Sequence, residues 1–121
     1  MTSLPILIVV LLLVGAAMVL LLAWAFYSDP QKGMAQATHR LEQLPLVMVD
    51  RYVAVGVLQI GLIFFGNLEM VAIFCIAGAI MGLGDGLIYA RAGHPHIKHT
   101  SSGVLALLGL GVTLYYMNAG V

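Results

Sequence analysis

The stretch Met70 to Ala90, MVAIFCIAGAIMGLGDGLIYA, contains a single charged residue, Asp85. A helix rises about 1.5 Å per residue and the hydrocarbon core of a bilayer is about 30 Å thick, so about 20 apolar residues make one span. A strand of a transmembrane barrel would instead alternate apolar and polar residues over about 10 positions. This stretch does not alternate, and it therefore predicts a membrane-spanning helix.

Three further runs of the same kind surround this one. Together the four runs cover residues 4–26, 44–66, 70–90 and 103–117. Short polar breaks join the later runs, which favours neighbouring antiparallel helices. We expect an all-α integral membrane four-helix up-and-down bundle that forms one domain over residues 1–121.

The first run has a second interpretation. Ala23-Trp24-Ala25 resembles the small-residue cleavage site of a secretory signal. A signal peptide usually begins with positive charge and has an apolar core of roughly 7–15 residues, whereas residues 1–5 carry no Lys or Arg and the run is longer. We expect a retained span.

The composition agrees with a membrane protein and excludes several other classes. Of the 121 residues, 62% are hydrophobic and 8% are charged, where a soluble domain carries about 25% charged residues. Five Lys and Arg balance five Asp and Glu, so no basic excess exists to attract nucleic acid. One cysteine cannot form a disulfide framework. We expect no nucleic acid partner and no cofactor.

The positive charges predict the orientation. They lie in two of the three connections or just inside a span: Lys32, Arg40, Arg51, Arg91 and Lys98. Connections rich in Lys and Arg stay on the cytoplasmic side. Both termini are therefore expected outside, in a multi-pass protein of a bacterial inner membrane.

The first of these connections contains residues that are typical of the start of a helix. Asp29 and Pro30 suit the cap and first turn of a helix, and Pro45 is expected to close the segment. A short interfacial helix is predicted, with an apolar face made of Met34, Thr38, Leu41 and Leu44. An ordinary solvated loop is the alternative.

Ionisable groups within spans are costly and mark either function or a fixed internal pair. The hairpin between the second and third spans turns near Asn67, so Arg51 and Asp85 lie at the same depth, roughly 25 Å from the turn. Their guanidinium and carboxylate groups are predicted to pair. The pair is either a latch between two helices or the polar end of a pocket in which Asp85 holds a ligand or moves a proton.

Small and polar residues are expected around this pair. Gly78, Gly82 and Gly86 repeat every four residues, which lets two helix backbones approach closely. Gly82 is also a candidate ligand contact. Tyr89, four residues after Asp85, is a second candidate, and the alternative is that Tyr89 is an aromatic residue at the membrane interface.

Gln59 lies in the middle of the second span, above Arg51. Its amide needs partners in hydrocarbon, so we expect it to face the bundle interior. There it either joins helices together or contacts a ligand above the ion pair.

The segment His94-Pro95-His96-Ile97-Lys98-His99 superficially suggests a metal site. No carboxylate or thiolate is adjacent, so we expect no metal and a loop that faces anionic headgroups. His99 is nevertheless a candidate acid or base, if it folds inward toward Asp85.

These residues resemble a known family. Arg51-x-x-x-x-Gly56, Leu83-Gly84-Asp85-Gly86-Leu87-Ile88 and the His99-led small residues that begin the last span are similar to the DoxX-like small four-helix membrane proteins, nearest a branch known only as a domain of unknown function. The resemblance implies the four-helix fold and implies that Arg51, Asp85 and His99 are the positions of interest. It supplies no activity.

Two functional hypotheses follow. In the first, the bundle binds a lipid or another lipophilic small molecule near the inner leaflet. Any catalysis would be proton transfer or isomerisation, with Asp85 or His99 as acid or base and Arg51 stabilising negative charge. In the second, the protein is an accessory or scaffolding subunit, or a homo-oligomer, whose Arg51–Asp85 pair is a latch and whose Gly78, Gly82 and Gly86 face docks a partner helix.

Overall fold

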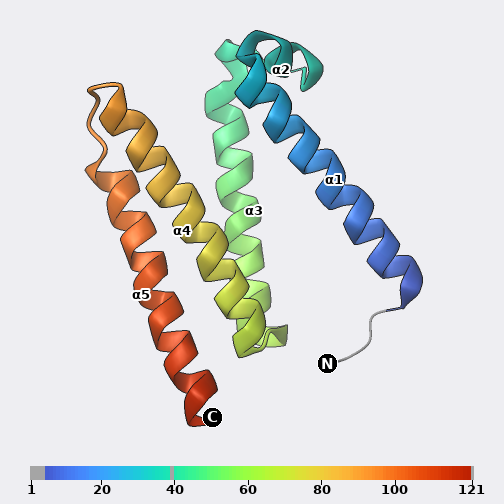
Figure 1. Cartoon of the computed structure of the whole chain (residues 1–121), viewed down its shortest axis with the longest axis vertical. Coiled ribbons are helices and arrows are strands. Elements are labelled where there is room, and N and C mark those ends of the chain that lie inside the picture. The colour runs from blue at the N-terminus through green and yellow to red at the C-terminus, as the bar shows by residue number, and fades with distance from the viewer. Residues whose placement is uncertain (1–4, 39, 121) are drawn as a thin grey trace. The chain divides into compact units, whose positions relative to one another are not determined.

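The computed structural model describes residues 5–38 and 40–120 and is helical along almost all of this length. The helices are α1 (Ile6–Ser28), α2 (Pro30–Gln36), the one-turn 3-10 helix η1 (Leu41–Gln43), α3 (Leu44–Phe65), α4 (Leu68–Arg91) and α5 (Ile97–Ala119) (Figure 1). No strand occurs among the described residues. The predicted all-α class is confirmed.

The chain forms two compact units, Met1–Tyr52 and Val53–Val121. The first contains the packed pair α1 and α2, and the second contains the packed pair α4 and α5. The boundary between the units falls inside α3.

Three helical segments of the described chain are long and apolar enough to cross a membrane. They are Leu41–Phe65, Leu68–Arg91 and Ile97–Ala119, with 25, 24 and 23 residues. At about 1.5 Å per residue each exceeds the roughly 30 Å of a hydrocarbon core. The chain therefore has the properties of an integral membrane protein, as the sequence predicts. A fourth span through α1, the bundle arrangement and the outer placement of the termini stay predictions.

The described side chains are arranged for lipid rather than for water. Ala72 and Ala79 are the only buried hydrophobic residues in the described part, whereas large residues such as Ile63, Phe65 and Ile80 are exposed at 78%, 88% and 69%. A soluble monomer seldom exposes an apolar patch larger than a few hundred Å². Lipid tails tolerate this surface because they are as apolar as the side chains.

The last helix begins earlier than the sequence predicted. α5 starts at Ile97 rather than at Gly103, so Lys98 and His99 lie in its first turn and the connection from α4 shrinks to residues 92–96. The prediction of one loop through His94 to His99 is therefore wrong for its second half. Apolarity marks where a helix enters hydrocarbon, and a helix can begin before that point in the headgroup region.

α4 begins directly after a short turn and has a side-chain cap. Asn67 is the cap residue, and its side-chain oxygen accepts a hydrogen bond of 2.9 Å from the backbone N–H of Met70. This bond satisfies one of the amides that every helix leaves free at its first turn. Two residues, Gly66 and Asn67, separate α3 from α4.

The short helix predicted after the first run is confirmed, with the expected cap. The Asp29 carboxylate accepts a hydrogen bond of 3.1 Å from the Lys32 backbone N–H, and Pro30 occupies the first turn. Gly33 lies against the end of α1, where a Cβ would stand 2.8 Å from the Cα of Phe26. This contact packs α2 onto α1.

The extent predicted for this short helix is wrong. α2 ends at Gln36, and Thr38 follows with a φ of 57°, a left-handed conformation that stops the helix. Met34 and Leu41 therefore do not share one helical face. Pro45 does not close the segment either, because it lies in the first turn of α3, where no backbone N–H is needed.

α4 and α5 pack along small residues, which we call the small-residue seam. Its members on α4 are Ala72, Cys75, Gly78, Ala79, Gly82 and Gly86, and those on α5 are Thr100, Gly103, Ala106, Gly109 and Thr113. A Cβ on Gly82 would lie 2.6 Å from the Cα of Gly103, and one on Gly103 would lie 2.6 Å from the backbone N of Leu83. The close approach predicted from Gly78, Gly82 and Gly86 is confirmed.

The seam buries one hydroxyl, that of Thr113. This hydroxyl donates a hydrogen bond of 2.7 Å to the Gly109 carbonyl one turn earlier on the same helix. A buried polar group is costly unless it is hydrogen-bonded. Thr113 can therefore serve as a small packing residue in the apolar part of the hairpin.

Candidate binding site

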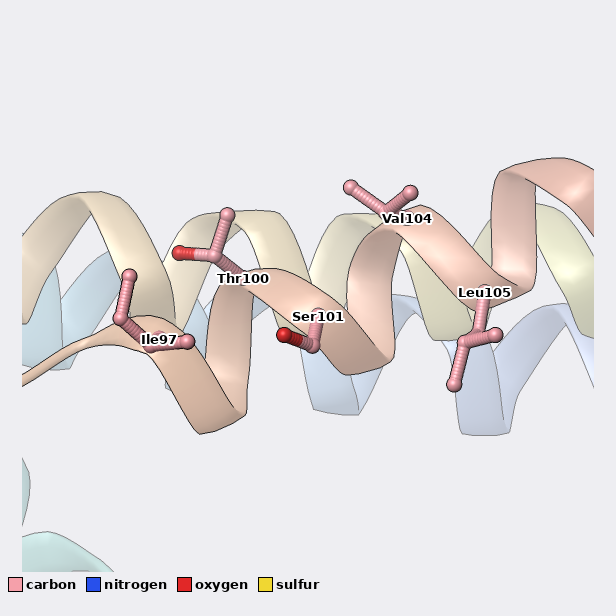
Figure 2. Close-up of a pocket in the computed structure, with 5 residues that line it drawn as sticks. All are labelled: Ile97, Thr100, Ser101, Val104 and Leu105. Carbon is pink, nitrogen blue, oxygen red and sulfur yellow. The ribbon is translucent and has the colours of Figure 1, made fainter.

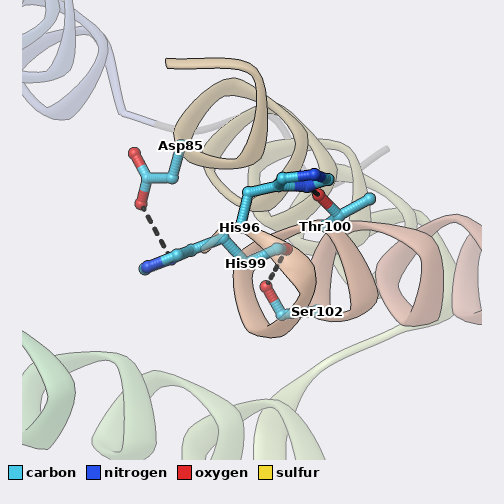
Figure 3. Close-up of polar contacts among 5 residues, drawn as sticks. All are labelled: Asp85, His96, His99, Thr100 and Ser102. Atoms are coloured by element: carbon cyan, nitrogen blue, oxygen red, sulfur yellow. Dashed lines mark hydrogen bonds and ion pairs between the residues drawn. The ribbon is translucent and has the colours of Figure 1, made fainter. Parts of the chain in front are cut away.

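The seam brings Asp85 and His99 together. Gly86 lies against Thr100 across the seam, and Asp85 and His99 directly precede these two residues in the sequence. The His99 Nδ1 atom is 3.8 Å from an Asp85 carboxylate oxygen (Figure 3). This distance is too long for a hydrogen bond but suits an ion pair when the imidazole is protonated.

Tyr89 completes the group. It follows Asp85 by one helical turn, and its ring stacks on the His99 imidazole with centroids 4.8 Å apart and an interplanar angle of 19°. The rings of Tyr89 and His94 also meet in an edge-to-face arrangement, with centroids 6.4 Å apart. The stack fixes the plane of the imidazole. We call Asp85, Tyr89 and His99 the polar cluster.

The polar cluster is open rather than sealed. The Asp85 side chain is 56% exposed and that of His99 is 37% exposed. A second molecule can therefore reach both groups. The seam immediately beside them, at Gly82 and Gly86, is closed by direct contact between helices.

The other predicted site residues are Arg51, Gln59 and Gly82. Arg51 belongs to the first unit and Asp85 to the second, so their ion pair stays a prediction, and the partner that the structure gives Asp85 is His99. Gln59 is exposed on α3, and its predicted contact with a ligand also stays a prediction. Gly82 is buried against Gly103 and Ser102 and acts in packing, while its role toward a ligand is untested.

Two polar contacts at the start of α5 were not predicted from the sequence. The His96 Nδ1 atom lies 3.0 Å from the Thr100 hydroxyl, and the Ser102 hydroxyl donates a hydrogen bond of 2.8 Å to the His99 carbonyl (Figure 3). The signal for both is the spacing of three or four residues, which places side chains one helical turn apart. This spacing predicts the two contacts only if residues 97–102 are known to be helical, which was not expected from the sequence.

The described histidines do not form a metal site. No group of three or more His, Cys, Asp or Glu side chains lies close enough to hold a metal ion in the part of the chain that the structure describes. The polar cluster itself offers an imidazole and a carboxylate. Such a pair can orient, accept or donate a proton.

A shallow groove of about 350 Å³ lies on a different face of α5. It is lined by Ile97, Thr100, Ser101, Val104 and Leu105 (Figure 2). Ser101 and His99 are two residues apart, which is about 200° around a helix. The groove and the polar cluster are thus separate features of one hairpin.

No protein-family model matches the chain, and neither a characterised protein nor a solved structure resembles it closely enough to count as a relative.

Proposed function

We propose that this chain is a small integral membrane protein that binds a lipophilic molecule with a polar head near the inner leaflet, and that the polar head lies at the polar cluster. The observation that carries the proposal is the meeting of Asp85 and His99 across two largely apolar helices, at 3.8 Å, with Tyr89 stacked on the imidazole. Ionisable groups at membrane depth mark functional sites by default.

The geometry of the pair favours a binding role over a purely structural one. A structural latch between helices gains most when both partners are buried and hydrogen-bonded. Asp85 and His99 are instead partly exposed and separated by more than a hydrogen-bond length. An open pair contributes little to stability, of order 1 kcal/mol or less. The seam already holds the two helices together.

The same geometry supports proton transfer or isomerisation on a lipid-like substrate, if the protein is an enzyme. Asp85 lies beside Nδ1 of His99 and would orient the ring, so that the other ring nitrogen, Nε2, can exchange a proton with the bound molecule. Arg51, expected at the same depth, would stabilise negative charge on that molecule. Gln59 would contact its less polar part.

The resemblance to DoxX-like proteins is compatible with this assignment. It points to Arg51, Asp85 and His99, and the structure brings the last two together. We extend the resemblance to the whole fold as part of the proposal, with four spans, both termini outside and a bacterial inner membrane as the location.

An accessory-subunit role is the second candidate, favoured by the fact that α3 buries none of its residues in the described structure. Such a helix has surface available for a partner subunit or a second copy. α5 of the same chain covers the face expected for this role at Gly78, Gly82 and Gly86. Any partner helix would bind elsewhere.

Native mass spectrometry of detergent-purified protein, with extraction of bound molecules, tests the proposal. We expect the wild type to retain a defined molecule and the Asp85→Asn and His99→Gln variants to lose it. Glu69→Gln is the matched control, because it removes the other carboxylate of α4 at the opposite end of the helix. Tyr89→Phe should keep the ring stack and most of the binding.

A different result would identify the Asp85–His99 pair as a structural latch. If wild type and Asp85→Asn carry the same molecules while the variant unfolds at a clearly lower temperature than Glu69→Gln, the pair is a latch. The accessory-subunit role would then be preferred, and cross-linking from α3 would be the next experiment.

A further inference from the structure

The groove on α5 is built like a site for one acyl chain. Its walls are Ile97, Val104 and Leu105, and the hydroxyl residues Thr100 and Ser101 lie toward the start of the helix (Figure 2). From residue 97 to residue 105 a helix rises about 12 Å, which approaches the roughly 15 Å of hydrocarbon in one leaflet.

Positive charge gathers at the polar end of this groove. Arg91 and Lys98 are the only Lys or Arg residues between positions 53 and 121, and both flank the turn at residues 92–96. Lys98 lies three residues before Ser101 and seven before Leu105, so helical spacing places it along one edge of the groove. Thr100, within the groove, is joined to His96 by the 3.0 Å contact.

Negative charge lies away from the groove. Asp85 is engaged with His99, which is on another face of α5 from Ser101, and Glu69 is at the far end of α4. The first turn of α5 contains no acidic residue. An anionic headgroup at the start of the groove would therefore meet Lys98 without a nearby repelling carboxylate.

We propose that this groove binds an anionic phospholipid, with one acyl chain along Ile97, Val104 and Leu105 and the phosphate beside Lys98. The Thr100 and Ser101 hydroxyls lie at the junction between chain and headgroup. This site is distinct from the polar cluster and does not depend on the function proposed for it.

Native mass spectrometry with two lipids tests the inference. The detergent-purified chain is mixed with equal amounts of phosphatidylglycerol and phosphatidylcholine that carry the same acyl chains. We expect retention of one phosphatidylglycerol in preference to phosphatidylcholine. A basic residue near an anionic membrane surface contributes about 1 kcal/mol, so Lys98→Gln should weaken the preference roughly fivefold.

Matched controls separate a site from general charge. Lys32→Gln removes a basic residue of α2, in the other unit, and should leave the preference unchanged. Ser101→Trp should fill the groove and release the lipid, while Ile80→Trp, at an exposed position of α4, should not. Circular dichroism confirms that each variant keeps its helical content.

Three outcomes would overturn the proposal. Equal retention of the two lipids would remove the role of charge. Equal losses in Lys98→Gln and Lys32→Gln would show general attraction rather than a site. A dimer in the spectra that Ser101→Trp abolishes would assign the groove to a second copy of the chain. Asp85→Asn should leave phosphatidylglycerol bound, so failure here is distinguishable from failure at the polar cluster.

Discussion

α3 and α4 are nearly the same length and comparably apolar, yet they pack very differently. The spans that contain them have 25 and 24 residues, and both are apolar enough to cross a membrane. α4 buries Ala72, Ala79, Gly82 and Gly86, whereas α3 buries none of its described residues. Both helices contain glycines, so glycine content alone does not explain the difference.

The spacing of the glycines explains it. On α4 the buried small residues recur every three or four positions and fall on one face, which α5 meets with its own small residues. Gly56 and Gly61 of α3 are five residues apart, and a Cβ on either would have no atom within 4 Å. Hydropathy thus governs whether a helix enters a membrane, and the spacing of small residues governs which helices pair.

The largest expected effect comes from adding one methyl group to the seam. Gly82→Ala places a Cβ against the backbone of Gly103, so the helices must separate and lose close contacts along their length. We expect the free energy of unfolding to fall by about 2 kcal/mol, as for overpacked cores. Titration with a denaturing detergent, followed by circular dichroism, measures the change.

Gly84→Ala is the control on the same helix. A Cβ at Gly84 has no atom within 4 Å, so this variant should be as stable as the wild type or slightly more stable. A similar loss in both variants would show that helix flexibility, and not the seam, explains the sensitivity of Gly82.

The turn that joins the two compared helices provides the next test. Asn67→Ala removes the acceptor for the Met70 N–H at the start of α4, and loss of such a cap costs about 1 kcal/mol. Thermal unfolding of Asn67→Ala beside Asn67→Asp, which keeps an oxygen acceptor, measures this contribution. Equal melting temperatures for the two variants would contradict the assigned capping role.

The polar end of the hairpin should contribute less to stability than the seam does. A double-mutant cycle with Tyr89→Ala and His99→Ala isolates the stacked pair, whose coupling we expect to be about 0.5–1 kcal/mol. Tyr89→Phe should retain the coupling, because the stack uses the ring. A coupling energy as large as the Gly82→Ala loss would make the cluster a structural element.

The smallest effect, of opposite sign, is expected on α3. Gly56→Ala adds a methyl group where no atom lies within 4 Å and replaces a flexible residue in a helix interior. The variant should gain about 0.5 kcal/mol in helix stability. A loss comparable to that of Gly82→Ala would show that Gly56 touches a partner helix, and would favour the accessory-subunit role.

The sequence alone determined the membrane character, the helical class and the approximate extent of the long helices. Runs of apolar residues carry this information because span length follows directly from bilayer thickness. The helix cap at Asp29 and Pro30 could also be predicted, because a cap depends only on residues that are neighbours in the sequence. The four-residue repeat of Gly78, Gly82 and Gly86 also predicted a close helix approach.

The tertiary structure decided which residues meet. His99 is the partner found for Asp85 because α5 begins at Ile97 and packs against Gly82 and Gly86, and neither fact is local in the sequence. The groove on α5 also depends on that early start, since its polar end lies in the helix's first two turns. Apolar patterning specifies which segments enter the membrane, whereas contacts between helices depend on how small residues of two distant segments align.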